Sequence, residues 1–376
     1  MAKPHITFHE SQPAKAQGLL AWLHIDLPLM IALLLLVGIG LAILFSAGDK
    51  EMVLLQKQLI RLGFGFAVMV ILAQIHPDNF RRWSPWLYGL GILFLVSVIL
   101  FGELGKGAQR WLDLGFVRFQ PSEMFKLTLP MLIAWYLAEQ RLPPSPSRLI
   151  AAALFTVLPV VLIAKQPDLG TALLVGSGGA FALFLAGISW RLIAVGGVLM
   201  AAMGPLAWYL MHDYQRQRVL TFLNPESDPL GTGYHIIQSK IAIGSGGISG
   251  KGWLNGTQSH LEFLPERHTD FIFAVISEEF GLVGVVALLM LYLFIILRGL
   301  YIASQAQDTF GRILAGALSL IFFVYLFVNA GMVTGLLPVV GVPLPLISYG
   351  GTSLVTILAS FGILMSIQTH KKLLPT

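Results

Sequence analysis

The sequence predicts an all-α membrane protein: about ten transmembrane helices in one bundle, with a long extracytoplasmic loop between spans 7 and 8. Of 376 residues, 56% are hydrophobic and only 11% are charged, and the mean hydropathy is +0.78. A soluble globular protein carries about a quarter charged residues. Apolar runs recur at lengths near the ~20 residues that cross a bilayer. One connection, residues 212–270, is far longer and more polar than the others.

The apolar runs define the predicted spans, and the turns between the fifth, sixth and seventh are short. The first run has no small-x-small cleavage site, which favours an uncleaved span over a signal peptide. Residues 1–20 form a polar tail, and residues 1–376 form a single integrated domain. The predicted spans are Leu27–Ala47, Gln58–Ile75, Trp83–Phe101, Ser122–Ala138, Leu149–Ala164, Leu169–Gly187, Leu192–Met211, Phe271–Leu297, Gly311–Leu336 and Ile347–Gln368.

The charges predict the orientation of this bundle. With the N-terminus in the cytoplasm, the inner segments hold eleven basic and five acidic residues, a net charge of +6. The outer segments hold the remaining 13 basic and 14 acidic residues, a net charge of −1. Since cytoplasmic loops are enriched in Lys and Arg, we expect both termini in the cytoplasm and the long loop outside.

Several function classes are excluded or disfavoured by composition. The chain has no cysteine, which excludes disulfides and thiolate metal sites. No basic cluster with interleaved aromatic residues indicates nucleic-acid binding. Residues 244–252 are rich in glycine, but their spacing fails the phosphate-loop pattern, so a turn is expected there. The apolar spacing in Tyr234–Ile243 predicts a short amphipathic helix at the interface.

The first group of candidate site residues opens the fourth span. Gln120 and Pro121 precede Glu123 and Lys126, which are three residues apart and therefore share a helix face. By itself this pattern favours a self-contained surface ion pair beside a capped helix start. Both charges lead into an apolar run, however, where charged residues are costly and are functional candidates.

The second group ends the long loop and comprises Glu262, Glu266, Arg267, His268 and Asp270. Asp270 lies at the start of the eighth span, where a carboxylate could simply cap the helix. Ser277 and Glu278 follow two turns later on a similar face. This polar stripe suggests a cavity that runs into the membrane.

The third group lies near the C-terminus. Asn329 precedes a segment rich in Pro and Gly, residues 335–345, and Ser348 opens a second such segment that ends at Ser353. Irregular backbone at membrane depth is tolerated only where protein or a water-filled cavity covers it. A tight hairpin with a close helix contact is the simpler alternative.

These three groups resemble the signatures of the SEDS family (shape, elongation, division and sporulation). Residues 264–273 are similar to the signature in that family's long loop, and residues 329–353 to its C-terminal signature. Residues 110–115 and 120–123 resemble the segment between its third and fourth spans. Arg267 favours the rod-shape branch over the division branch, where a small residue is expected.

The resemblance implies a peptidoglycan glycosyltransferase that polymerises lipid II, a disaccharide-pentapeptide on undecaprenyl pyrophosphate, outside the cytoplasmic (inner) membrane during cell elongation. It assigns the essential aspartate to Asp270 and a conserved pair to Glu123 and Lys126. Expected partners are a class B penicillin-binding transpeptidase and other membrane proteins of the elongation machinery. Ser348 is expected to support the substrate site.

The chemistry requires a base for the acceptor hydroxyl and cations for the pyrophosphate leaving group. Asp270 is the candidate base. A helix N-terminus and Lys126 would weaken it as a base, so orientation of the hydroxyl or binding of Mg²⁺ or Mn²⁺ stays open. The cations available for the pyrophosphate are Arg110, Lys126, Arg216, Arg218, Lys240 and Lys251.

Two other functions fit a polytopic protein with charged residues in its spans. A lipid II flippase would also use broken helices and a polar cavity, although these charges gather on one side and no inverted repeat is visible. A non-enzymatic scaffold of the elongation machinery is the third reading.

Overall fold

The computed structural model describes residues 23–105, 108–113, 118–140, 142–211, 213–227, 232–260 and 266–371. The polar tail 1–20 and Glu262 lie outside these ranges. The helices are α2 (Leu27–Ala47), α3 (Met52–Gln74), α4 (Pro77–Phe101), α5 (Pro121–Ala138), α6 (Pro146–Lys165), α7 (Leu169–Leu185), α8 (Trp190–Ala202), α9 (Gly204–Leu210), α10 (Asp213–Leu223), α11 (Thr232–Gly246), α12 (Thr257–His260), α13 (Ile272–Ser304), α14 (Thr309–Thr334) and α15 (Thr352–Thr369), with a 3₁₀ turn at Pro225–Ser227.

The helices account for the ten predicted spans. Within the described ranges, seven are long and apolar enough to cross a membrane: α2, α3, α4, α6, α13, α14 and α15. The fourth and sixth predicted spans are the shorter α5 and α7. The seventh is divided into α8 and α9 at Met203, two residues before Pro205. Proline has no N–H to continue the hydrogen bonds of a preceding helix and is tolerated in a first helical turn, which explains a new helix that starts at Gly204.

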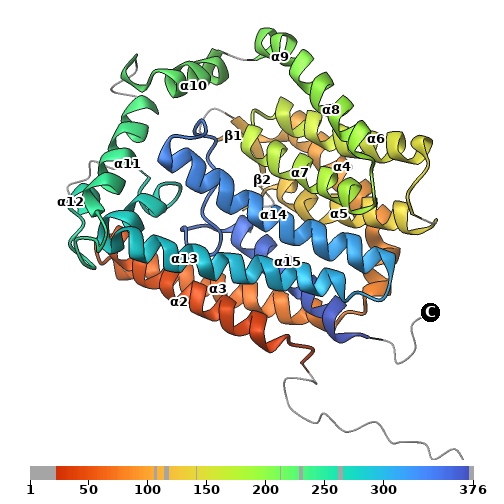
Figure 1. Cartoon of the computed structure of the whole chain (residues 1–376), viewed down its shortest axis with the longest axis horizontal. Coiled ribbons are helices and arrows are strands. Elements are labelled where there is room, and N and C mark those ends of the chain that lie inside the picture. The colour runs from red at the N-terminus through yellow and green to blue at the C-terminus, as the bar shows by residue number, and fades with distance from the viewer. Residues whose placement is uncertain are drawn as a thin grey trace, which may run out of the picture.

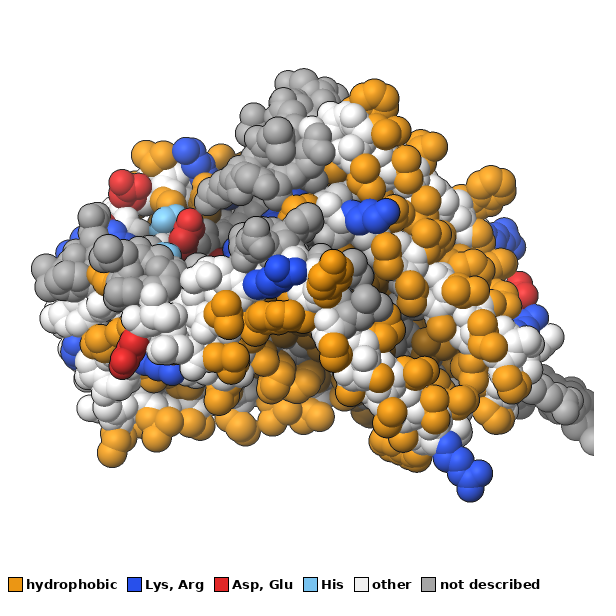
Figure 2. All heavy atoms as spheres, turned by 90° about the horizontal axis from the view of Figure 1, so that it is seen from above, with side chains coloured by type: hydrophobic (Ala, Val, Ile, Leu, Met, Phe, Trp, Pro, Cys, Tyr) orange, Lys and Arg blue, Asp and Glu red, His pale blue; other side chains and the backbone are white. Residues whose placement is uncertain are grey.

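Helix α14 occupies the middle of the bundle (Figure 1). It packs against α13, α7, α5, α11 and α15, and it is the most deeply buried of the seven candidate spans. Outside this core, α2 packs on α13, and α3 on α15. Large apolar side chains are exposed along the outer helices, as Figure 2 shows for one face. Such a surface suits a lipid environment.

The two ends of the described chain meet at one end of the bundle. The rings of His24 and His370 stack with centroids 4.0 Å apart, and His24 Nδ1 lies 3.2 Å from Thr369 Oγ1. His76, at the α3–α4 turn, packs edge-on against His370. Burial lowers the pKa of His370, and the nearby His24 and His76 lower it further. The start of α2 and the end of α15 therefore lie on the same side of the bundle.

Two aspartates cap helices in a similar way at opposite ends of the protein. Asp26 caps α2 by accepting the Leu29 N–H at 3.0 Å, and it pairs with Arg298 at 2.6 Å. Asp168 caps α7 by accepting the Thr171 N–H at 3.2 Å. Side chains of this type satisfy the free amides of a first helical turn. Each aspartate is only 6% exposed.

Helix α13 is interrupted at Gly281, where φ is 61° and ψ is −162°. The long loop covers the break with its own main chain. Lys251 N and Gly252 N donate to the carbonyls of Glu278 and Glu279, and Leu282 N and Val283 N donate to the carbonyls of Gly247 and Ile248. These bonds satisfy peptide groups that the break frees. The glycine-rich segment is thus a structural clamp on the helix that follows Asp270.

The structure adds elements to the long loop and to one shorter connection. A helix at Tyr234–Ile243 is confirmed within α11, which packs on α13; its place at the membrane interface stays a prediction. The connection between α4 and α5 contains a small antiparallel sheet that the all-α prediction lacked: β1 (Glu103–Gly105), β2 (Ala108–Asp113) and β3 (Arg118–Phe119). This sheet carries Arg110 toward the start of α5.

Candidate functional site

A polar cavity of about 220 Å³ brings together the first and third groups of residues. Its wall comes from β2, the first turns of α5 and α7, the middle of α14 and the start of α15. The irregular segment 341–343 and Gly351, the residue before α15, complete it. The segment rich in Pro and Gly therefore lines a cavity, as expected of irregular backbone at membrane depth.

Glu123 and Lys126 form a buried ion pair in this cavity. Lys126 Nζ donates to Glu123 Oε1 at 2.5 Å and also to the hydroxyl of Tyr325 on α14. Both charged residues are about 5% exposed, and Glu123 Oε2 is buried without a hydrogen bond. The pair is not the exposed one that the surface alternative required. Burial of two charges in a bundle of membrane-length helices is costly.

A second charged cluster lies in the same cavity. Gln120 Nε2 donates to Asp168 Oδ2 at 2.9 Å, and Arg110 Nη1 lies 3.9 Å from Asp168 Oδ1. Arg110 is oriented by main-chain carbonyls, since its Nε donates to Gln166 O and its Nη2 to Pro167 O. Gln166 in turn donates to Leu95 O at 3.0 Å. The sequence pointed to Arg110 and Gln120 but not to Asp168, which lies in the short turn between the fifth and sixth predicted spans.

Asp270 approaches this cavity at Gly341. A Cβ on Gly341 would lie 3.5 Å from Asp270 Oδ2, and Gly341 itself lines the cavity with φ at +71°. The carbonyl of Asp270 accepts a hydrogen bond from Asn329 Nδ2 at 2.9 Å, and the same nitrogen donates to Val342 O at 2.8 Å. Asn329, fully buried on α14, thereby ties the Asp270 turn to the cavity wall.

The turn before Asp270 is held from the C-terminal segment. Ser348 Oγ donates to Thr269 O at 2.5 Å, and Tyr349 N donates to His268 O at 2.8 Å. The Ser348 hydroxyl also accepts the Leu344 N–H at 2.8 Å. Ser348 is therefore a support for the turn, and this contact shows how the second and third sequence groups meet.

The other residues of the second group surround the turn. Glu266 has a positive φ of 52° and accepts the Thr269 hydroxyl at 2.8 Å. Arg267 pairs with Asp49, at the α2–α3 connection. The His268 ring packs edge-on against Tyr349, which also stacks under the Arg61 guanidinium. These contacts fix the main chain beside Asp270.

The basic residues of the loop that were expected at the pyrophosphate lie in different places. Arg218 Nη1 donates to Val339 O at 3.3 Å, next to the cavity segment. Arg216 donates to the carbonyls of Trp208 and Tyr209, which end α9. Lys240 packs against Gly335. Of these three, none lines the cavity.

Two expectations for the eighth span are wrong. The helix begins at Ile272 with Phe271 at its cap, so Asp270 is not the capping residue. The polar stripe below it does not line the cavity either. Glu278 is fully buried, and its Oε1 accepts Lys251 Nζ at 2.7 Å and Gln258 N at 2.9 Å. Glu278 of this stripe instead binds the long loop, which covers the break at Gly281.

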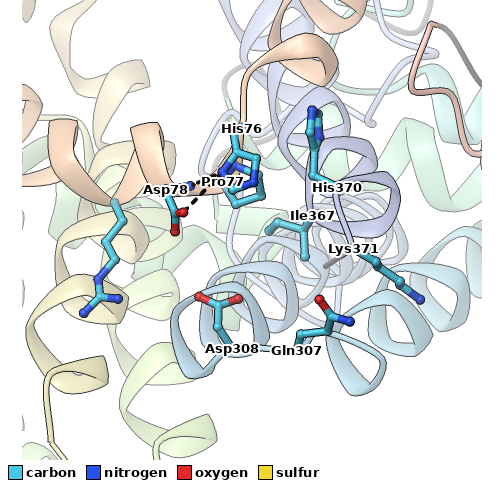
Figure 3. Close-up of a pocket in the computed structure, with 9 residues that line it drawn as sticks. His76, Pro77, Asp78, Gln307, Asp308, Ile367, His370 and Lys371 are labelled. Atoms are coloured by element: carbon cyan, nitrogen blue, oxygen red, sulfur yellow. Dashed lines mark hydrogen bonds and ion pairs between the residues drawn. The ribbon is translucent and has the colours of Figure 1, made fainter. Parts of the chain in front are cut away.

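A second hollow, of about 140 Å³, lies at the other end of α13 (Figure 3). Its charged groups come from the connections between helices and include Asp78, Asp308 and His76. His76 and Asp78 form an ion pair whose side chains are 41% and 49% exposed. Half-exposed charges cost little. The buried charges of the first cavity make it the stronger candidate site.

No group of three His, Asp or Glu side chains in the described part of the chain is arranged to hold a metal ion. Glu123 and Asp168 line the cavity, whereas Asp270 approaches it at Gly341. Carboxylate oxygens are ligands that Mg²⁺ takes, and the described residues do not gather three such side chains at one point.

Comparison with known proteins agrees with the sequence resemblance. Residues 19–373 match the FtsW/RodA/SpoVE family of cell cycle proteins. The chain is 56% identical to the peptidoglycan glycosyltransferase MrdB of Escherichia coli K12, over 93% of this chain and 95% of that protein. A chain from a solved peptidoglycan synthase complex, described as coordinating polymerization and crosslinking, is 35% identical with a TM-score of 0.80, over 92% of this chain and 99% of that one. The rod shape determining protein RodA of Thermus thermophilus is 30% identical with a TM-score of 0.71, over 93% and 99%.

Proposed function

Because this chain belongs to the FtsW/RodA/SpoVE family, we propose that it is a peptidoglycan glycosyltransferase that polymerises lipid II during cell elongation. The observation that carries the proposal is the polar cavity with two charged clusters buried in a bundle of apolar helices. The transfer of a sugar from a lipid diphosphate requires cations and a base, in a site that the substrate can reach while its lipid stays in the membrane. A relative that matches over 93% of this chain is named a peptidoglycan glycosyltransferase.

Asp270 is assigned as the general base that removes the proton of the acceptor hydroxyl. Its support is geometric: the carboxylate approaches the cavity at Gly341, and Asn329 and Ser348 fix the turn that carries it. Displacement at C1 then gives an inverted, β-linked product. The leaving diphosphate needs positive charge more than a proton, so a second catalytic carboxylate is not required.

Lys126 and Arg110 are assigned to the diphosphate. Both line the cavity, and each has a carboxylate neighbour that balances its charge before substrate binds. A divalent cation, Mg²⁺ or Mn²⁺, belongs to this proposal only with the diphosphate as co-ligand, since the described residues hold no group of three side chains that could bind it alone. In that case chelation with EDTA stops polymerisation, and either ion restores it.

We assign the cavity to the outer face of the cytoplasmic membrane, with both termini inside. The charge asymmetry supports this, and so does the meeting of His24 with His370 at the end of the bundle away from Asp270. The chain lacks cysteine, so single-cysteine variants can test it by labelling intact cells. Ser249→Cys should react with an impermeant maleimide, whereas Gln305→Cys should not; the reverse pattern contradicts the assignment.

The proposed partner is a class B penicillin-binding transpeptidase. One similar solved chain comes from a complex that coordinates polymerization and crosslinking. Co-purification of the two membrane proteins after co-expression tests this directly. Separation of the two at low detergent, with both folded, would argue against a stable complex.

Polymerisation itself is tested with purified protein and labelled lipid II in detergent. The wild-type protein, alone or with the transpeptidase, should give glycan polymer on a gel, and folded Asp270→Ala protein should give none. A flippase or a scaffold would give no polymer in this assay. Neither forms glycosidic bonds, and detergent leaves no bilayer across which lipid II could be moved. Absence of polymer with the partner present would overturn the proposed function.

A further inference from the structure

Asp168 is a buried carboxylate of the cavity that the proposed chemistry leaves unused. It is 6% exposed and lines the cavity together with Arg110 and Gln120. A buried charge is expensive unless it is paired and hydrogen-bonded. A cap alone does not require one, because asparagine caps a helix about as well as aspartate.

The two oxygens of Asp168 have different contacts. Oδ1 accepts the Thr171 N–H at 3.2 Å and lies 3.9 Å from Arg110 Nη1. Oδ2 accepts the side-chain amide of Gln120 at 2.9 Å. One carboxylate therefore links β2, the start of α5 and the start of α7 across a single stretch of the cavity wall.

The guanidinium of Arg110 is oriented but not consumed by these contacts. Its Nε and Nη2 donate to the carbonyls of Gln166 and Pro167. Its Nη1 faces Asp168 at 3.9 Å, which is beyond hydrogen-bond distance. Arginine has five N–H donors in a planar fork that suits phosphate oxygens. Lys126, by contrast, is bonded to both Glu123 and Tyr325.

We propose that Asp168 is a positioning residue for the diphosphate of the lipid-linked donor, acting by holding Arg110 and Gln120 at the cavity wall. This rests on the proposed function and deepens it by locating the diphosphate at the Arg110 side of the cavity. The negative charge of Asp168 fixes Arg110 and balances its charge in the empty cavity. The arriving phosphate oxygens then take the donors on Nη1.

The protein supplies a matched control for the capping role of Asp168. Asp26 is also an N-cap aspartate, is equally buried and also pairs with an arginine, Arg298 at 2.6 Å. It lies at the other end of the bundle from the cavity. Asp168→Asn and Asp26→Asn each keep a capping oxygen and remove one buried charge. Asp26 is bonded more closely to its arginine than Asp168 is, so Asp26→Asn is the more demanding control for stability, and it lies away from the cavity.

The test measures polymerisation of lipid II and its inhibition by undecaprenyl diphosphate. Asp168→Asn should raise both the KM for lipid II and the inhibition constant by roughly 10- to 100-fold, the size expected for one lost interaction with a charged group. Asp26→Asn should leave both constants unchanged, even where its melting temperature falls. Gln120→Leu, which keeps the α7 cap, should shift the same constants in the same direction.

The coupling to Arg110 is tested with a double variant. If Asp168 acts through Arg110, Arg110→Ala combined with Asp168→Asn should be no worse than Arg110→Ala alone. Losses that multiply, or an Asp168→Asn protein with unchanged KM and inhibition constant, would overturn the proposal. Direct binding of labelled undecaprenyl diphosphate reports on Asp168 even without polymerisation, so failure of the proposed function is distinguishable.

Discussion

The contact between Asn329 and the Asp270 turn gives the sharpest structural prediction. Asn329 is fully buried on α14, and both of its donated hydrogen bonds go to main-chain carbonyls, those of Asp270 at 2.9 Å and Val342 at 2.8 Å. Its own oxygen, Oδ1, is buried without a partner. The substitution Asn329→Leu removes both donors and keeps the number and branching of the side-chain heavy atoms.

The expected loss follows from the two bonds. Each hydrogen bond contributes about 0.5–1.5 kcal/mol net, so removing both costs about 1–3 kcal/mol. If that energy holds the Asp270 turn in place, the rate of polymerisation should fall by roughly 5- to 150-fold. Part of the loss in stability is offset because the unpaired Oδ1 is removed as well.

The assay compares polymerisation rate and melting temperature in the purified protein. Ser319→Ala is the control, because Ser319 is a buried polar residue of the same helix whose hydroxyl bonds only to Ala315 O within that helix. It should keep its rate. Folded Asn329→Leu protein that polymerises at the wild-type rate would refute the role given to this contact.

Three further predictions concern stability. Gly246→Ala should lower the melting temperature, because a Cβ there would lie 2.0 Å from a carbonyl oxygen of α13, whereas Gly244→Ala meets open space and should not. Lys251→Met should destabilise the protein by about 3–5 kcal/mol at most, since it leaves the fully buried Glu278 without its ion-pair partner, and adding Glu278→Gln should recover most of the loss. Burial lowers the pKa of His370, so the unfolded chain binds a proton there more readily than the folded protein. Stability should be full above the ordinary histidine pKa of 6.5 and fall as the pH drops below it. His370→Gln should flatten this fall in melting temperatures measured between pH 7.5 and 5.5.

The sequence predicted the helices and the cavity segments better than the partners of individual charges. Periodicity and length define apolar spans, so Leu27–Ala47 was predicted to the residue. The Pro and Gly residues after Asn329 require irregular backbone wherever they lie, so their place at a cavity followed from the cost of unsatisfied peptide groups. Glu123 and Lys126 were found because they are charged residues inside an apolar run.

Contacts between distant elements were not readable in this way. Asp168 lies in a short turn between two predicted spans, and only the fold places β2 and α5 beside it. Arg216 has the same charge as Arg110 and also donates to two carbonyls, but those carbonyls end α9, and Arg216 does not line the cavity. A sequence gives the charge of a side chain, whereas the partner that balances this charge depends on packing.

The general-base assignment is tested most directly by Asp270→Asn, which keeps the shape of the side chain and removes its charge. The control is Asp308→Asn, since Asp308 also precedes a long helix, at the other end of the bundle. In a single-turnover assay with labelled lipid II and the transpeptidase present, Asp270→Asn should lose at least about 100-fold in rate, the lower range for general-base catalysis, while its affinity for undecaprenyl diphosphate and its melting temperature hold. Polymer formed by Asp270→Asn at the rate of Asp308→Asn would contradict the account.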